Sequence, residues 1–449
     1  MFDLLIKNGT VVLSQGAARH DIGILGGKIA ALGWPGSLGA AAAEIDAAGL
    51  VILPGLIDAH VHGGHGDPDR ETFHNASMAA AAGGITTILE QPLSNPSTVT
   101  VSRLKDKLQS AQEQFVVDFS LWGGLVPGHL ADLAPMAEFG AKAYKSFMCR
   151  CSNYPMTDDG TLLAGMKEIA ELGGLVAVHA ENDTLMQQLI DQFKAEGRND
   201  VQAYLDSHPE YTELEAINRF IFFASLVPEC KAHIVHMSIP DGAEAIKAAR
   251  ARGVSNLSFE TCPQYLGLSE DDLLAQGGVA KCDPPVRSRE SVEKLWQYVL
   301  DGTVDIIAGD HSPHAPERKQ ATNGDFWTVS EGVTSLQTLL PVVLTEGRRR
   351  GLTWERLAEL CSTNPARLFG LYGRKGAIGV GFDADLVLLD PEAEWELRDE
   401  DLFYLHKNSP YTGRTFKGKV KQTLVRGTTV YREHEITVEP GFGRFYPQE

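Results

Sequence analysis

The chain of 449 residues is 43% hydrophobic and 22% charged, the composition of an ordinary globular protein with a sizeable core. Its formal net charge of −19 argues against nucleic acid or an anionic membrane as the natural partner. The sequence holds no apolar run of about eighteen residues, so it predicts no membrane span.

The start of the chain and its cysteines indicate a cellular compartment. Met1 leads directly into strand-like sequence, without a basic start or a long apolar segment, so we expect no secretory signal. The six cysteines show no paired zinc-finger spacing, and we expect reduced thiols rather than a disulfide framework. The sequence therefore favours a cytoplasmic protein.

The two ends of the chain consist of short predicted strands separated by turns. Near the start, Asn8-Gly9 is a strong hairpin signal. The predicted strands are residues 2–6, 11–13, 21–25 and 29–32 at the start, and 384–389, 420–425 and 428–431 at the end. The first group is too small to close a core of its own. We therefore expect one small β-sandwich domain built from residues 1–52 and 373–449.

Between these ends, residues 53–372 alternate strands with helices. The predicted strands are the one that ends at His60 and residues 84–90, 115–119, 143–147, 175–179, 233–236, 257–260 and 304–308. The predicted helices include residues 76–82, 162–172, 212–225, 240–252 and 291–300. This alternation predicts an α/β fold with a closed (β/α)8 TIM-like barrel. A doubly wound open sheet is the alternative, although no Gly-x-Gly-x-x-Gly fingerprint follows the first strand.

Histidines gather at the predicted strand ends. His60 and His62 have one residue between them, so on a strand both side chains point to the same side. His179 ends the fifth strand, His236 ends the sixth, and Asp310 follows the eighth. In such a barrel the carboxyl ends of the strands meet at one mouth, where the chemistry occurs. Imidazole and carboxylate bind zinc and similar divalent cations, so the sequence predicts a metal site there.

Lys145 lies near the end of the fourth strand, facing the same mouth. A charged lysine would be repelled by cations, but a buried lysine readily shifts its pKa and becomes a neutral amine. A neutral amine can add carbon dioxide and form a carbamate whose two oxygens bridge two cations. The alternative is a surface or salt-bridged lysine, a role for which Lys142 is the better candidate.

Several stretches together resemble the amidohydrolase superfamily, and within it the cyclic amidohydrolases: hydantoinases, dihydropyrimidinases, allantoinases and dihydroorotases. These stretches are residues 54–62, 145–147, 178–181, 236–238 and 309–311. The resemblance implies two divalent cations per chain, with zinc expected and cobalt or manganese as alternatives. One cation would be held by His60, His62, carboxylated Lys145 and Asp310. The other would be held by Lys145, His179 and His236.

The implied reaction is hydrolysis of a cyclic amide. A hydroxide shared by the two cations attacks the ring carbonyl. Asp310 takes the hydroxide's proton and delivers it to the leaving ring nitrogen. Further residues are expected to contact the substrate, in part through the main chain: Arg150, Cys151, Asp283, His314 and Gly332.

The identity of the ring is suggested by stretches that look most like allantoinases. They are residues 261–266, 281–287, 310–313 and 406–414. Hydantoinases and dihydropyrimidinases typically place a tyrosine five residues after the bridging lysine, where this chain has Arg150; Tyr154 is out of register. Allantoin is therefore the expected substrate.

Some positions depart from the allantoinase pattern. Gln264 replaces the usual histidine, Asp283 stands where alanine is common, and residues 65–68 form a different loop. We interpret Asp283 either as an acid facing the substrate or, with slight preference, as a solvated loop carboxylate.

Other functions remain open from the sequence. The first alternative is ring opening of hydantoins or dihydropyrimidines. A dihydroorotase is next: Gly64 stands where that group carries an arginine, with Arg70 and Arg150 as the candidates to replace it, and His314 is dihydroorotase-like. A deaminase generally lacks the bridging lysine, and a non-catalytic scaffold has lost metal ligands. The resemblance also implies a homotetramer or homodimer.

Overall fold

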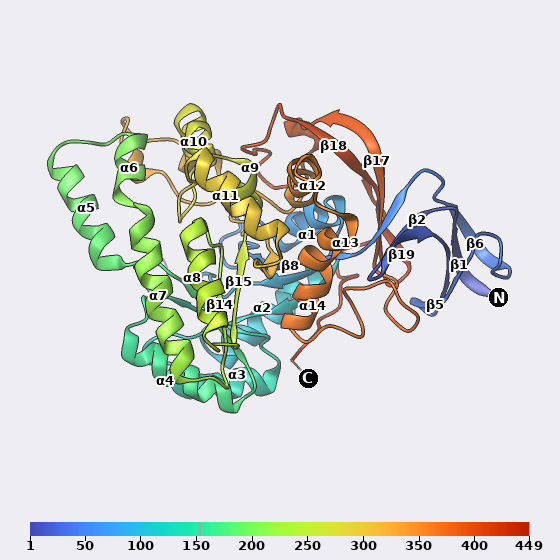
Figure 1. The fold of residues 1–449 in the computed structure, drawn as a ribbon, viewed down its shortest axis with the longest axis horizontal. Coiled ribbons are helices and arrows are strands. Elements are labelled where there is room, and N and C mark those ends of the chain that lie inside the picture. Colours follow the sequence, from blue (N-terminus) through green and yellow to red (C-terminus); the bar gives the residue numbers. More distant parts are fainter. Residues whose placement is uncertain (152–153, 449) are drawn as a thin grey trace.

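The structure is a computed structural model that describes residues 1–151 and 154–448. Helix-covered strands from the middle of the chain form one part, and sheets from both chain ends form the other (Figure 1). Among the described residues, no helix combines the length and the apolar character needed to cross a bilayer.

Eight parallel strand segments form the barrel, each paired with the next. They are β8 (Leu56–Val61), β9 (Ile85–Glu90), β10 (Asp118–Leu121) continued by β11 (Gly123–Gly124), β12 (Tyr144–Phe147), β13 (Leu175–His179), β14 (Lys231–Ile234), β15 (Leu257–Thr261) and β16 (Ile306–Ile307). A parallel bridge between Val61 and His311 joins the first strand to the segment after the last and closes the ring. The predicted TIM-like barrel is confirmed.

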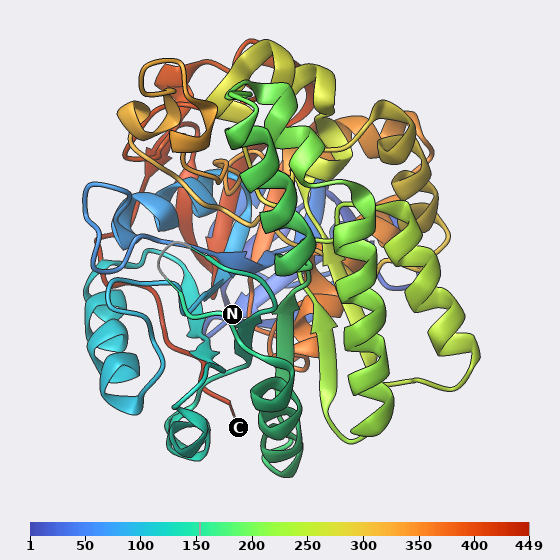
Figure 2. The same cartoon turned by 90° about the vertical axis from the view of Figure 1, so that its left-hand side faces the viewer.

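Helices follow the strands and lie around them (Figure 2). They are α1 (Phe73–Ala82), α2 (Val101–Gln114), α3 (Leu133–Phe139), α4 (Asp159–Glu171), α5 (Asp183–Ala195), α6 (Val201–Ser207), α7 (Glu210–Leu226), α8 (Pro240–Ala251), α9 (Pro263–Gly267), α10 (Glu270–Gln276), α11 (Arg289–Leu300), α12 (Leu339–Arg349), α13 (Trp354–Ala358) and α14 (Asn364–Leu368). The predicted helices are present, but several begin earlier than expected. Side-chain caps such as Thr72 and Asp158 accept a backbone N–H before the apolar pattern starts.

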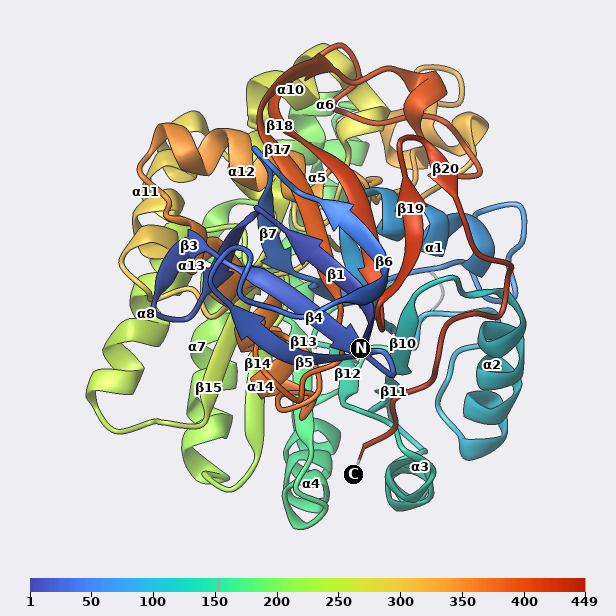
Figure 3. The ribbon, with the colours of Figure 1, turned by 90° about the vertical axis from the view of Figure 1, so that its right-hand side faces the viewer.

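Two sheets assembled from both chain ends pack against each other (Figure 3). The smaller sheet contains β1 (Phe2–Lys7), β4 (Asp21–Leu25), β5 (Lys28–Gly33) and β6 (Ala41–Asp46). The larger contains β2 (Thr10–Leu13), β3 (Gly16–Arg19), β7 (Val51–Pro54), β17 (Leu386–Glu396), β18 (Thr415–Val425), β19 (Thr428–Arg432) and β20 (Glu435–Ile436). Ile22, Ile52 and Leu386 belong to the buried core of this part. The expected β-sandwich is thus formed by strands from both ends.

Two local predictions were wrong. Asn8-Gly9 does not close a hairpin, because β1 pairs with β4 and β6 whereas β2 pairs with β3 and β7. The turn instead carries the chain from one sheet to the other, and Asn8 donates to Asp46 Oδ1 at 2.8 Å. The third barrel strand begins at Asp118, not at residue 115. Residues 115–117 are buried and apolar, so a connecting segment has the sequence of a strand.

The junction between the two parts positions the first barrel strand. β7 ends at Pro54, and after Gly55 the chain enters β8, which leads to His60. A Cβ on Gly55 would lie 2.2 Å from the hydroxyl oxygen of Thr86 on β9. Glycine therefore allows β8 and β9 to approach closely at the start of the barrel.

Candidate active site

The ends of the barrel strands surround a cavity of about 600 Å³. Its walls include all the residues that the sequence singled out for metal or substrate: His60, His62, Lys145, Arg150, Cys151, His179, His236, Asp283, Asp310, His314 and Gly332. The four histidines predicted as metal ligands, Asp310 and Lys145 are all buried. The fold therefore brings together residues that are up to about 270 positions apart in the sequence, as parallel strands in a ring require.

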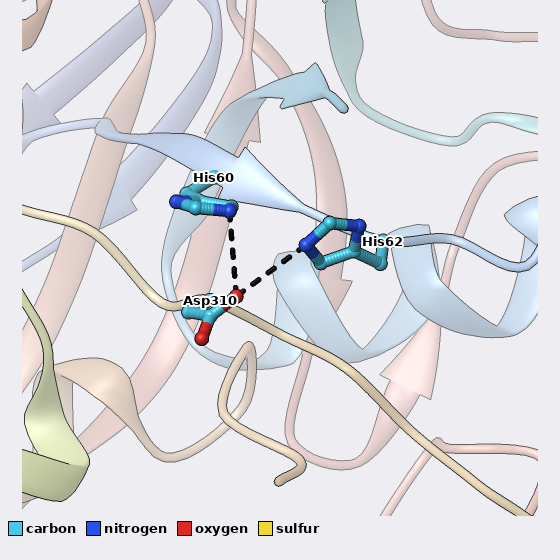
Figure 4. A group of neighbouring side chains, drawn as sticks. All are labelled: His60, His62 and Asp310. Carbon is cyan, nitrogen blue, oxygen red and sulfur yellow. Dashed lines mark ion pairs between the residues drawn. The ribbon is translucent and has the colours of Figure 1, made fainter. Parts of the chain in front are cut away.

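His60, His62 and Asp310 form a compact donor group (Figure 4). The Nε2 atoms of both histidines lie 3.4 Å from Asp310 Oδ1. Two donors that each lie ~2.1 Å from a tetrahedral zinc ion are separated by roughly 3.4 Å. The spacing of these three side chains therefore fits one divalent cation.

Glu260 fixes the orientation of His60. The Nδ1 atom of His60 lies 2.5 Å from Glu260 Oε1, so Nδ1–H donates to the carboxylate and Nε2 keeps its lone pair for a cation. The second oxygen of Glu260 accepts from His233 Nε2 at 3.2 Å. The backbone N–H of His236 also donates to Oε1, at 3.2 Å. One buried carboxylate thus links β8, β14 and β15.

Asp58 joins the first strand to the segment that carries Asp310. Its Oδ1 accepts from the backbone N–H groups of His60 at 3.1 Å and Gly309 at 2.8 Å. A Cβ on Gly309 would lie 2.3 Å from the other carboxylate oxygen, so only glycine leaves room for this contact. Burial raises the pKa of Asp58 to about 7. Asp310 follows with a positive φ of 50°, a sharp turn at the strand end.

Lys145, His179 and His236 form the second group. Lys145 Nζ lies 3.4 Å from His60 Nε2, and the rings of His179 and His236 are 4.5 Å apart. The Nε2 atom of His179 contacts Glu181 Oε2 at 2.8 Å, which leaves Nδ1 as its free nitrogen. Among the described residues, no ion pair joins Lys145 to a carboxylate, and burial lowers the pKa of Lys145 to about 8. A buried amine without an anionic partner fits the predicted carbamate.

Lys142 does not have the surface position considered for it in the sequence. Its side chain is buried, with an exposed fraction of 3%. Unlike Lys145, it is not among the residues that line the cavity. The two lysines therefore differ in their access to the metal site and not in burial.

Asp283 lies in the cavity wall with 28% of its side chain exposed, which favours the interpretation as an acid facing the substrate over that as a solvated loop carboxylate. Its Oδ1 is 3.5 Å from His208 Nε2, and the carboxylate of Glu181 lies in the same cluster. Burial raises the pKa of Asp283 to about 6. Two carboxylates, Asp283 and Glu181, thus lie beside the group of Lys145, His179 and His236.

The remaining predicted contacts lie nearer the mouth of the cavity. Arg150 is 61% exposed, and its Nε lies 3.0 Å from both oxygens of Asp183. His314 donates from Nε2 to the carbonyl oxygen of Glu331 at 2.8 Å. Gly332 has both main-chain groups engaged, its N–H by Lys281 O at 2.9 Å and its carbonyl by Lys319 Nζ at 2.6 Å.

Tyr154 does not supply a phenol to the cavity. Its hydroxyl donates to the backbone carbonyl of Lys145 at 3.1 Å, and its ring packs against Phe147. Tyr154 is not among the residues that line the cavity; the phenol in this wall is that of Tyr204, whose hydroxyl donates to the backbone carbonyl of Cys282 at 2.7 Å.

Sequence reasoning did not identify the carboxylates that orient the ligands. Glu260, Asp58 and Glu181 are buried and contact His60 or His179 directly. Each lies in or beside a strand that was predicted from the sequence. A carboxylate in or next to a predicted strand was therefore the one feature of the sequence that could have indicated this role. The sequence does not show whether each of these side chains points toward a histidine.

Comparisons with known proteins agree with this geometry. The profile of the amidohydrolase family matches residues 51–430. An allantoinase of Rubrobacter xylanophilus is 44% identical over 99% of this chain and 97% of its own length. An allantoinase of Solibacter usitatus is 42% identical over 98% of this chain and 96% of its own length. The solved structure of an L-hydantoinase (dihydropyrimidinase) from Arthrobacter aurescens has a TM-score of 0.96, with 39% identity and full coverage of both chains.

The contact between Glu260 and His60 leads to a prediction about metal affinity. Glu260→Gln should weaken metal binding by roughly 10- to 100-fold, because a neutral amide holds the Nδ1–H of His60 less firmly. Competition with a chromophoric chelator measures the affinity. The control is Asp385→Asn, since Asp385 is a buried carboxylate that is bound to Lys375 and does not line the cavity. Unchanged affinity in Glu260→Gln would show that the contact does not support the metal site.

Proposed function

The chain belongs to the amidohydrolase family and is a cyclic-amide hydrolase; we propose that its preferred reaction is the ring opening of allantoin to allantoate. The observation that carries the proposal is the group of His60, His62 and Asp310 in one cavity with a buried Lys145 that forms no ion pair among the described residues. The full-length similarity to allantoinases supports the choice of ring.

We propose that two divalent cations are held at this site, zinc being the expected metal and cobalt or manganese the alternatives. His60, His62, Lys145 and Asp310 would hold one. Lys145, His179 and His236 would hold the other. When bound, two such cations supply a hydroxide at neutral pH and polarise the attacked carbonyl.

Lys145 supports this arrangement through its burial. Its lowered pKa leaves a usable fraction of neutral amine at neutral pH. The neutral amine attacks carbon dioxide, forms a nitrogen–carbon bond and releases one proton, which gives a carbamate. The product is an anion in a position where an ammonium would repel cations.

Asp310 moves the proton. Its Oδ1 lies 3.4 Å from the Nε2 atoms of both His60 and His62, so it would lie beside an oxygen bound to the cation that they would hold. Asp310 accepts the proton of that oxygen as the carbonyl is attacked. It then donates the same proton to the ring nitrogen as the carbon–nitrogen bond breaks. The ring opens to an N-carbamoyl product that carries a new carboxylate.

Ring opening of substituted hydantoins is the second candidate. Apolar side chains line part of the cavity, among them Leu93, Phe147 and Met186, and would accommodate a hydrophobic substituent. The relative with the TM-score of 0.96 is named for this activity. The same metal site and the same Asp310 would serve either ring.

Two further proposals concern the setting of the enzyme. Among the described residues no two cysteines form a disulfide, which supports a cytoplasmic location. A homotetramer or homodimer is the expected assembly, because related enzymes are often oligomeric. Gel filtration with light scattering measures the assembly directly.

The carbamate at Lys145 predicts a coupled loss. Lys145→Ala should lose both bound metal and hydrolysis, and a short carboxylic acid such as acetate should restore part of each by supplying two oxygens. Metal analysis and a ring-opening assay measure the two effects. Lys142→Ala is the matched control, since it removes a buried lysine outside the cavity and should keep the metal. An unmodified ammonium at Lys145 with both cations bound would contradict the proposal.

The proton transfer by Asp310 predicts a different pattern. Asp310→Asn should lower turnover by roughly 10²- to 10⁴-fold, the usual contribution of general acid–base catalysis. A substantial part of the metal should stay bound, because the histidines and Lys145 remain. Steady-state kinetics and metal analysis of the same sample separate the two roles. Turnover close to that of the wild type would exclude the proton-transfer role.

The position of Tyr154 predicts a preference among rings. A six-membered dihydropyrimidine that relies on a phenol beside the attacked carbonyl would lack that donor here, a loss of ~3 kcal/mol. We therefore expect kcat/KM to be highest for allantoin, lower for hydantoin and lowest for dihydrouracil. Assays of the three rings with metal-loaded protein measure this order. A value for dihydrouracil equal to that for allantoin would overturn the preference.

A further inference from the structure

Arg70 is a cation in the cavity wall that the proposed mechanism does not use. It lies in the loop between β8 and α1, and it lines the cavity together with His62 and Asp310. Its Nε donates to the carbonyl oxygen of Pro313 at 2.8 Å, and its Nη2 donates to Ser312 Oγ at 2.5 Å. Within residues 1–151 and 154–448, no carboxylate pairs with Arg70 and no acceptor meets its Nη1.

These two contacts hold the guanidinium near the reaction centre. Ser312 is two residues from Asp310, and two residues of chain span at most about 7 Å. The guanidinium is planar, so fixing Nε and Nη2 on one edge also fixes the direction of Nη1. Two N–H groups on Nη1 are therefore available in a defined position.

The other arginines of the cavity have a different setting. Arg150 is 61% exposed and is paired with Asp183, and Arg318 is 58% exposed and lies 3.9 Å from Asp67. Arg70 is more buried than either and has no counter-ion among the described residues. A guanidinium with free donors in a confined site favours an oxygen acceptor on the ligand.

Resting on the proposed function, we propose that Arg70 binds an oxygen acceptor carried by the ring carbon next to the attacked carbonyl. This acceptor is the urea carbonyl of a ureido arm or the oxygen of a carboxylate arm. The two share one chemistry, a strong acceptor on a short substituent. Arg70 is then a specificity-determining residue: it selects substituted rings over the bare hydantoin ring.

The test compares three rings that differ only in this arm: allantoin, 5-carboxymethylhydantoin and unsubstituted hydantoin. Arg70→Gln should lower kcat/KM for at least one of the two substituted rings by 10-fold or more relative to hydantoin. Arg70→Lys keeps the charge but has no Nη1, so it should show the same selective loss. It is the second variant and serves as the test if Arg70→Gln does not fold.

Arg356→Gln is the matched control. Like Arg70, Arg356 holds two acceptors of the chain, in its case the backbone carbonyls of Val299 and Val304; it also pairs with Glu359 at 3.2 Å, and it does not line the cavity. It should lower the melting temperature without changing the ratio between substituted and unsubstituted rings. A loss confined to allantoin would identify the urea carbonyl as the acceptor, and a loss confined to the carboxymethyl ring would identify a carboxylate.

Equal losses for all three rings in both Arg70 variants would mean that Arg70 only holds residues 312–313 in place, and the inference would be wrong. That result leaves the proposed function intact, because the wild type still opens the rings. A metal-loaded wild type that opens none of the three rings would instead refute the proposed function, and this inference with it.

Discussion

The geometry of His60 and His236, two of the candidate metal ligands, depends on hydrogen bonds to one buried carboxylate, that of Glu260. It receives the Nδ1–H of His60, the ring of His233 and the backbone N–H of His236, so strands β8, β14 and β15 are fixed relative to one another. A buried charge is costly unless it is fully paired. The same bonds that offset this cost set the tautomer of His60 and direct its Nε2 into the cavity.

The positions of the ligands could be predicted because a parallel barrel converts sequence order into a ring of strand ends. His60 and His62 followed from strand alternation, and Asp310 from its place after the eighth strand. The carboxylates behind them could not be predicted in the same way. Whether Glu260 faces a histidine or solvent depends on the twist and register of neighbouring strands, which the sequence does not state.

The local errors have physical causes of the same kind. Residues 115–117 are apolar and fully buried, so composition alone does not distinguish this connection from a strand. Asn8-Gly9 has the backbone preference of a hairpin turn, but pairing with distant strands decides where the chain goes. Asp283 resembled a solvated loop residue until tertiary contacts placed it beside His208 and Glu181.

The central claim is that a pair of cations at His60, His62, Lys145, His179, His236 and Asp310 supports the opening of a cyclic ureide. The most direct measurement is the rate of allantoin hydrolysis as metal-free protein is titrated with zinc in bicarbonate buffer. The account predicts no hydrolysis without metal and a rate that rises until two equivalents per chain are bound. Full activity in the metal-free protein, or no hydrolysis at two bound equivalents, would contradict it.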